Sequence, residues 1–137
     1  MMKCVLDKDA ILPVRAHAAD AGYDLFSRED AIIYGGDCWT FDTGVHLAIP
    51  EGWVGDVESK SSLMKHGLIT DGTVDAGYTG SIRVKLFNLS RCAMSIVKGQ
   101  KIAQLVIKKI NTPELEVVDR LDDTERGEGG FGSTGMF

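Results

Sequence analysis

The residues best suited to chemistry lie near the C-terminus, where Arg126 to Gly135 read Arg-Gly-Glu-Gly-Gly-Phe-Gly-Ser-Thr-Gly. Glycine permits close approaches that let main-chain amides surround a ligand. An arginine fork matches phosphate oxygens, and the ring of Phe131 offers a face on which a base can stack. These residue types favour a nucleotide-binding tail. A disordered glycine-rich terminus is the alternative, and the run alone does not decide between them.

Aspartates beside glycine form the second set of candidates. Asp20 and Asp24 lie on either side of Ala-Gly-Tyr, and Asp75 lies within the glycine-rich stretch 72–80. We expect both stretches to be tight turns, because aspartate next to glycine usually stabilises turns. The functional alternative is a carboxylate that positions a metal ion or takes a proton from water.

Familiar catalytic and metal-binding motifs are missing from the sequence. The three histidines lack zinc-like spacing, the tail lacks the Gly-Lys-Ser/Thr ending of a P-loop, and there is no Gly-x-Ser-x-Gly elbow. The three cysteines are widely spaced, which predicts reduced and mostly structural thiols. We therefore expect no covalent nucleophile.

Composition narrows the kind of partner. A chain of 137 residues fits one domain, residues 1–137, with a real hydrophobic core. The net charge of −5 argues against a nucleic-acid polymer but permits a mononucleotide, which needs only local cations. No apolar run approaches the ~20 residues that span a membrane, and the N-terminus lacks the apolar core of a signal peptide. We expect a cytoplasmic protein, or one in the host cytoplasm if it is viral.

The elements that must position these groups read as strands. Apolar and polar residues alternate over 45–49 and 82–86, and 102–107 resembles a strand buried on both faces. Shorter β-like runs lie at 32–34, 39–41, 53–57 and 115–118, and turn signals lie at 35–37, 50–52, 71–72, 98–99 and 111–113. This pattern predicts an all-β sandwich, jelly roll or barrel.

One segment reads as a short helix instead. Ser61 to Gly67 begins with two serines, which suit the N-cap, and ends on a glycine. Its N-terminus after Lys60 could cradle a phosphate, and the alternative is a capped surface turn.

Taken together, these segments resemble the trimeric dUTPase family (deoxyuridine 5′-triphosphate nucleotidohydrolase). Five family motifs stand in order over nearly the whole chain, at 19–27, 59–64, 72–80, 99–105 and 122–135. The resemblance implies an all-β, jelly-roll-like fold with one short helix, assembled as a homotrimer. It also implies active sites at subunit interfaces, with residues 126–137 forming a glycine-rich lid that closes over a neighbour's site.

The implied reaction is the hydrolysis of dUTP to dUMP and pyrophosphate by water attack on the α-phosphate, with Mg²⁺ bound by the phosphates. Such a reaction limits uracil in DNA and supplies dUMP for thymidylate synthesis. Asp75 matches the family's general base and Gln104 the residue that helps to hold the water. Tyr78 matches the aromatic that packs on deoxyribose, and the backbone of Thr73, Val74 and Asp75 would pair with the uracil edge.

The remaining matches concern the phosphates. Ser61 and Ser62 match phosphate contacts, and Asp24 matches an aspartate that contacts Mg²⁺ through water. In the lid, the resemblance implies that Arg126 binds the terminal phosphate and that the Phe131 ring stacks over uracil. It also implies that three further residues wrap the phosphates: Gly132, Ser133 and Thr134.

The sequence departs from the family pattern twice. Lys60 stands where the family usually has arginine, so a bidentate fork becomes a point charge at a phosphate or subunit contact. The loop 66–75 is shorter than in many members and lacks their asparagine. Two other functions stay open: a dCTP deaminase, which shares the fold, and a nucleotide-binding protein that regulates a partner through ordering of its tail.

Overall fold

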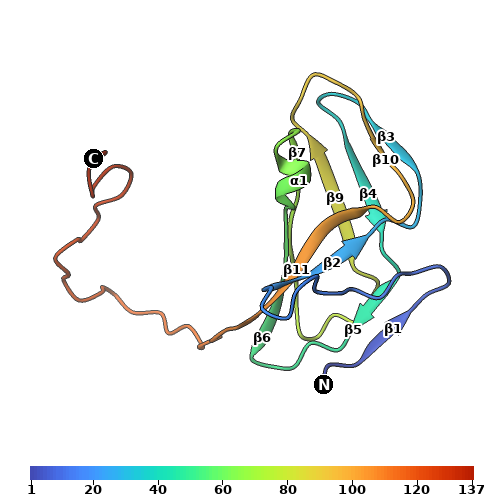
Figure 1. The fold of residues 1–137 in the computed structure, drawn as a ribbon. Coiled ribbons are helices and arrows are strands. Elements are labelled where there is room, and N and C mark those ends of the chain that lie inside the picture. Colours follow the sequence, from blue (N-terminus) through green and yellow to red (C-terminus); the bar gives the residue numbers. More distant parts are fainter.

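The structure is a computed structural model that describes all residues from Met1 to Phe137. Figure 1 shows an all-β body with one short helix and a long tail, residues 110–137, that extends away from it. The elements in chain order are β1 (Cys4–Leu6), β2 (Gly22–Phe26), β3 (Ala31–Ile33), β4 (Cys38–Asp42), β5 (Val45–Leu47), β6 (Trp53–Glu58), α1 (Ser61–Met64), β7 (Leu68–Ile69), β8 (Asp71–Val74), β9 (Arg83–Asn88), β10 (Met94–Ile96) and β11 (Lys101–Lys109).

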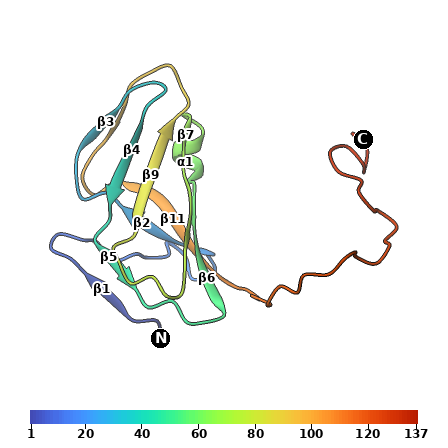
Figure 2. The ribbon, with the colours of Figure 1, turned by 180° about the vertical axis from the view of Figure 1, so that it is seen from behind.

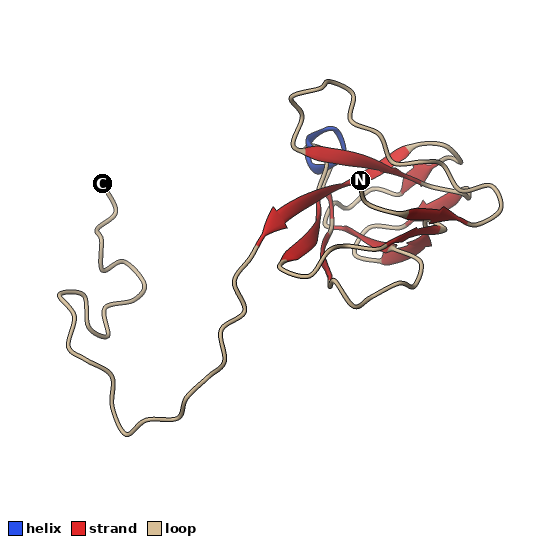
Figure 3. Ribbon diagram, turned by 90° about the horizontal axis from the view of Figure 1, so that it is seen from below, coloured by secondary structure: helices blue, strands red, loops and turns tan.

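All strand pairs are antiparallel, and no strand pairs with the next one along the chain. One sheet has the order β2-β11-β6-β8, a second has the order β4-β9-β7, and β1-β5 and β3-β10 form two further pairs. Figures 2 and 3 show the body from behind and from below, with β11 crossing it before the chain leaves as the tail. The all-β prediction with one short helix is confirmed.

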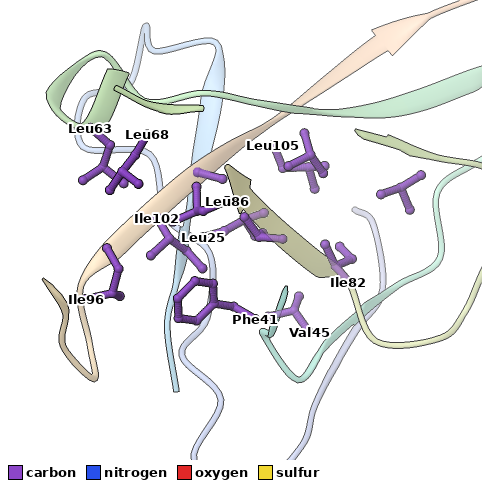
Figure 4. Close-up of a cluster of buried hydrophobic side chains, with 14 of the residues drawn as sticks. Leu25, Phe41, Val45, Leu63, Leu68, Ile82, Leu86, Ile96, Ile102 and Leu105 are labelled. Atoms are coloured by element: carbon purple, nitrogen blue, oxygen red, sulfur yellow. The ribbon is translucent and has the colours of Figure 1, made fainter. Parts of the chain in front are cut away.

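The hydrophobic core lies between the two larger sheets (Figure 4). Leu25, Ile102 and Leu105 from one sheet meet Phe41 and Leu86 from the other, and all five are fully buried. Burying one such side chain contributes roughly 1.5–3 kcal/mol to folding. The cluster therefore holds the sheets together and gives the strands that carry Asp24 and Gln104 a rigid base.

The predicted alternation is confirmed in two strands. In β9, Val84 and Leu86 are buried while Arg83 and Lys85 are exposed. In β5 the two flanking residues face the core and His46 points the other way. The segment 102–107 forms the middle of β11, but Gln104, Val106 and Ile107 are only half-buried, so both faces are fully buried only at Ile102 and Ala103.

One predicted strand and one predicted turn are wrong. Residues 115–118 form no strand and are exposed, because a strand needs a neighbouring backbone and this part of the tail has none in the single chain. The turn signal at Asp71-Gly72 lies inside β8, where these residues pair with Glu58 and Val57 of β6. Cross-strand pairing overrides the local preference there.

The structure also corrects one prediction about the three cysteine thiols. All three cysteines are free, so the prediction of reduced thiols is confirmed. They are also all exposed, so the prediction that they are mostly structural is wrong. Cys4 and Cys38 lie in edge strands and Cys92 in the loop before β10, and none of the three belongs to the hydrophobic core.

The predicted helix is present but shorter and differently capped. It spans Ser61–Met64, its N-cap is Lys60, and no side chain bonds the first amides, so the serine cap is wrong. Leu63 anchors the helix in the core, and the turn that follows ends at Gly67 with a φ of 87°. No helix of the structure is long and apolar enough to cross a membrane.

Candidate active site

The predicted site residues of the body fall into two clusters at opposite ends of β6. Asp75 follows Val74, which pairs with Gly55 near the start of β6. Gln104 pairs with Glu58 at the end of that strand, two residues before Lys60. Asp75 therefore lies at the level of Val54 on β6, and Gln104 lies at the level of Glu58. At about 3.3 Å per residue, these two levels are roughly 13 Å apart along the strand. One chain therefore does not bring Asp75 and Gln104 together.

The first cluster lines a cleft of about 230 Å³ at the end of β8. Thr73, Val74, Asp75 and Tyr78 all line it, as the sequence predicted for a nucleoside site, and Arg83 adds a cation. The Asp75 and Tyr78 side chains are exposed, and Val74 is buried. A carboxylate, an aromatic ring and free backbone edges thus share one small opening.

The tight turn predicted over 72–80 is confined to its second part, Asp75 to Gly80, because residues 71–74 form β8. The Tyr78 amide donates to the Asp75 carbonyl at 3.0 Å, and the Tyr78 hydroxyl donates to the Ser81 carbonyl at 2.9 Å. β8 pairs with β6 and β9 pairs with β4 and β7, so the strands on either side of the turn belong to different sheets.

The second cluster centres on Asp24, which lies inside β2 and is only 5% exposed, so the prediction of a turn there is wrong. One carboxylate oxygen is paired with the Lys60 ammonium and the other with the Lys101 ammonium at 2.8 Å. Burial favours the neutral acid, but hydrogen bonds and positive charge from Lys101 and Lys60 outweigh it and lower the pKa of Asp24. Asp20 does lie in a turn, where its carboxylate accepts the His17 amide at 2.8 Å.

Gln104 is held beside this ion cluster by two features. Its amide nitrogen donates to the Ser59 carbonyl at 3.2 Å, on the approach to α1. Its side chain passes over Gly22, where an added Cβ would lie 2.5 Å from Gln104 Oε1 and 3.0 Å from its Cβ. The glycine of the first motif therefore makes room for the glutamine of the fourth.

The phosphate-binding candidates are exposed. Ser61 and Ser62 open α1 with free hydroxyls on the surface. The lid lies away from the body, with local turns in which Arg126 Nε donates to the Gly129 carbonyl at 2.7 Å and the Phe131 ring is fully exposed. Arg126, Ser133 and Thr134 line one open hollow of the lid. In the single chain none of the lid residues reaches either cluster.

Comparisons with known proteins show the family to which the chain belongs. The dUTPase family model matches residues 8–135. The deoxyuridine 5′-triphosphate nucleotidohydrolase of Clostridium kluyveri is 46% identical over 136 residues, covering 96% of this chain and 95% of the relative. The chain belongs to the dUTPase family. The mouse dUTPase is 43% identical over 132 residues, covering 95% of this chain and 82% of the mouse chain.

Solved dUTPase structures share the whole fold. The Staphylococcus bacteriophage 80alpha dUTPase with dUPNHPP superposes with a TM-score of 0.92 at 34% identity, covering 98% of both chains. A mutant dUTPase from phage phi11 of S. aureus, whose structure concerns the coordination of a structural Mg(II) ion, has a TM-score of 0.84 at 30% identity, covering 90% of this chain and 99% of that one.

The side chains of this dUTPase build no metal cage of their own. No three His, Cys, Asp or Glu side chains are grouped to hold a metal ion. Both oxygens of Asp24 accept hydrogen bonds from ammonium groups, so this carboxylate does not fit a direct metal ligand. A contact through water, which is what the dUTPase resemblance implied, stays a prediction, and it suits Mg²⁺ because this ion keeps much of its hydration shell.

The sequence did not single out two charged residues of these clusters. Lys101 is the second partner of Asp24, and Arg83 lines the cleft of Asp75 and Tyr78. Arg83 stands at an outward position of an alternating strand, where a surface charge is the ordinary interpretation. Lys101 lies within the fourth dUTPase motif, and only its pairing across β11 and β2 places it at Asp24.

The ion pairs of Asp24 with Lys60 and Lys101 predict that the free energy of unfolding falls at low pH. Because the pKa of Asp24 is lower in the folded chain than its ordinary 3.8, its contribution is present above that value and is lost as pH falls through the folded pKa. Lys101→Met should lower the unfolding free energy at neutral pH by about 1 kcal/mol and move the acid limb of the stability curve upward. Urea unfolding between about pH 2 and pH 7 measures both.

Lys98→Met is the matched control, since the Lys98 ammonium makes no ion pair. An acid limb that shifts equally in both variants would show that Lys101 acts only through net charge.

Proposed function

We propose that this dUTPase hydrolyses dUTP to dUMP and pyrophosphate. One observation carries the proposal: a carboxylate, Asp75, and an aromatic ring, Tyr78, share a small cleft with the free backbone of Thr73 and Val74. This set suits a nucleoside whose α-phosphate must lie near a general base. The relatives named as deoxyuridine 5′-triphosphate nucleotidohydrolases support it at 43–46% identity.

In the proposed mechanism, Asp75 takes a proton from a water molecule as that water attacks the α-phosphorus of dUTP. A new P–O bond forms, the bond from the α-phosphorus to the bridging oxygen breaks, and pyrophosphate leaves with its electron pair. Gln104 orients the water through its amide, which the Ser59 carbonyl and Gly22 hold in place. General-base catalysis of this kind contributes about 10²- to 10⁴-fold.

Discrimination between nucleotides would come from the same cleft. The Tyr78 ring packs on deoxyribose and leaves no room for a 2′-hydroxyl, which rejects UTP. Backbone groups of Thr73, Val74 and Asp75 pair with the uracil edge, and cytosine would leave them unpaired. The ring is held for this task by its hydroxyl, which is bonded to the Ser81 carbonyl.

We further propose that the complete site is built by a homotrimer with tail exchange. The roughly 13 Å between the Asp75 and Gln104 levels of β6 favours a site that takes Asp75 from one subunit and Gln104 from another. The long, exposed tail suits a lid lent to a neighbour. There, Arg126 would bind the terminal phosphate and Phe131 would stack on uracil, while Ser61 and Ser62 contact the phosphates.

The remaining lid residues, Gly132, Ser133 and Thr134, would wrap the phosphates in this proposal. Bound Mg²⁺ would neutralise charge on the triphosphate, with Asp24 reaching it only through water. We treat residues 1–137 as one dUTPase domain and 126–137 as its lid. In the cell, the enzyme would act on a small nucleotide in the cytoplasm, limiting uracil in DNA and supplying dUMP.

A pyrophosphate-release assay with dUTP, dCTP, dTTP and UTP tests the substrate. We expect a preference for dUTP of at least about 10²-fold over each of the others. The backbone pattern rejects cytosine, the Tyr78 ring rejects the 2′-hydroxyl of UTP, and the close-packed turn leaves no room for the methyl group of thymine. Deamination of dCTP without pyrophosphate release would instead identify a deaminase. Nucleotide binding without turnover of any of the four would identify a binding protein that acts on a partner.

A further inference from the structure

The turn that carries Asp75 and Tyr78 makes most of its hydrogen bonds within its own stretch of chain. Its two hydrogen bonds, from the Tyr78 amide to Asp75 and from the Tyr78 hydroxyl to Ser81, join residues of the same stretch. They shape the turn but do not place it against the body. A catalytic group must be held to within a fraction of an ångström, so an external contact is needed.

On both sides of this turn, the chain is hydrogen-bonded to the body. Before it, Val74 is paired with β6. After it, the Ser81 hydroxyl bonds the Asp42 carboxylate and accepts the Gly44 amide at 2.9 Å, and the Ile82 amide donates to Val45 at 2.8 Å. Between these anchors, Ala76 packs against the hydrophobic core, and residues 75–80 receive one side-chain hydrogen bond from outside the turn.

That hydrogen bond comes from His46, in the middle of β5. Its Nδ1 lies 2.8 Å from the Thr79 carbonyl oxygen, and its Nε2 lies 3.1 Å from a carboxylate oxygen of Asp7. Because Val45 and Leu47 face the core, His46 is turned outward toward the turn, and it lies opposite Val5 of β1. The ring thus bridges the turn to the start of the chain.

We propose that His46 is a positioning residue for dUTP hydrolysis, one that holds the Asp75–Gly80 turn against β5 through the Thr79 carbonyl. The inference rests on the function proposed above. Both partners of the ring are hydrogen-bond acceptors, so both ring nitrogens must donate. Neutral histidine has one N–H and the imidazolium has two, and the complete bridge therefore needs the protonated ring.

The charges around the ring set the direction of its pH dependence. The hydrogen bonds to the Thr79 carbonyl and to Asp7, with the negative charges of Asp7 and Asp42, raise the pKa of His46 above its ordinary 6.5. His46 also lines a second cleft, separate from that of Asp75, and Lys3 is the cation in its lining. Since the folded pKa is raised, the bridge is complete below pH 6.5 and loses one contact as pH rises through the folded pKa.

Two substitutions separate positioning from a merely structural role. His46→Ala removes both contacts, whereas His46→Gln keeps one donor that does not titrate. His17→Gln, at an exposed histidine on the loop before β2, controls for the loss of a histidine. Each full-length protein would be measured from about pH 6 to pH 9 for kcat and KM with dUTP. Amide-exchange protection of residues 75–80 and the NMR titration of His46 are measured in parallel.

We expect His46→Ala to lower kcat/KM about tenfold at pH 6.5, which corresponds to the loss of the hydrogen bond to the Thr79 carbonyl. The gap to wild type should narrow at high pH, where the neutral wild-type ring keeps only one of its two donors. Protection of the turn should fall in wild type as His46 deprotonates, be low at every pH in His46→Ala, and show no such step in His46→Gln. The Gln variant should recover most of the activity.

A kcat/KM ratio between His46→Ala and wild type that is the same at every pH would overturn the proposal, as would an NMR pKa for His46 at or below 6.5. If wild type does not hydrolyse dUTP, the proposed function fails on that result alone. The exchange and NMR measurements then still decide whether His46 holds the turn.

Discussion

Asp75→Asn should lower the turnover of dUTP by between about 10² and 10⁴-fold while leaving nucleotide binding nearly intact. Asparagine has the same shape as aspartate but cannot accept the proton of the attacking water. The Asp75 side chain is exposed in the cleft and makes no side-chain hydrogen bond, so the substitution breaks no structural contact. Pyrophosphate release measures turnover, and titration with a non-hydrolysable dUTP analogue measures binding.

Asp71→Asn is the matched control for this experiment. Asp71 is an exposed aspartate on β8, four positions before Asp75, and the change of charge is identical. It should keep close to full turnover. If Asp75→Asn retained turnover as well, another group would have to take the proton, and the proposed base would be wrong.

Deletion of residues 126–137 should leave a folded trimer that has lost at least about 10²-fold in kcat/KM for dUTP. The lid makes no contact with the body in the single chain, so its loss removes no core packing. The proposed lid completes the site by excluding water and fixing the phosphates, and a small misplacement there is costly. Circular dichroism and light scattering would follow the fold and the mass, and pyrophosphate release the activity.

Removing only Met136 and Phe137, which lie beyond the part matched by the family model, controls for shortening the chain. Unfolding of the longer deletion would show that the lid is a structural element. Full activity of that deletion would show that the proposed contacts of Arg126 and Phe131 do not contribute to the reaction.

The sequence alone determined the fold class and the family. Alternation along β5 and β9 depends only on which face of a strand meets the core, so it is readable locally, and five ordered motifs identified a dUTPase. The shape of the Asp75 turn was not readable, because the strands on either side of it belong to different sheets. The strand predicted at 115–118 failed because a strand requires a partner, which a local pattern cannot supply.

Only the tertiary structure decided how the charged groups meet. Asp24 looked like a turn residue, and cross-strand pairing makes it a buried carboxylate between Lys60 and Lys101. His46 looked like one polar residue in an alternating strand, and the fold places it on the Thr79 carbonyl. No strand pairs with its successor, so contacts that join residues far apart in the chain follow from the strand order, which local composition does not encode.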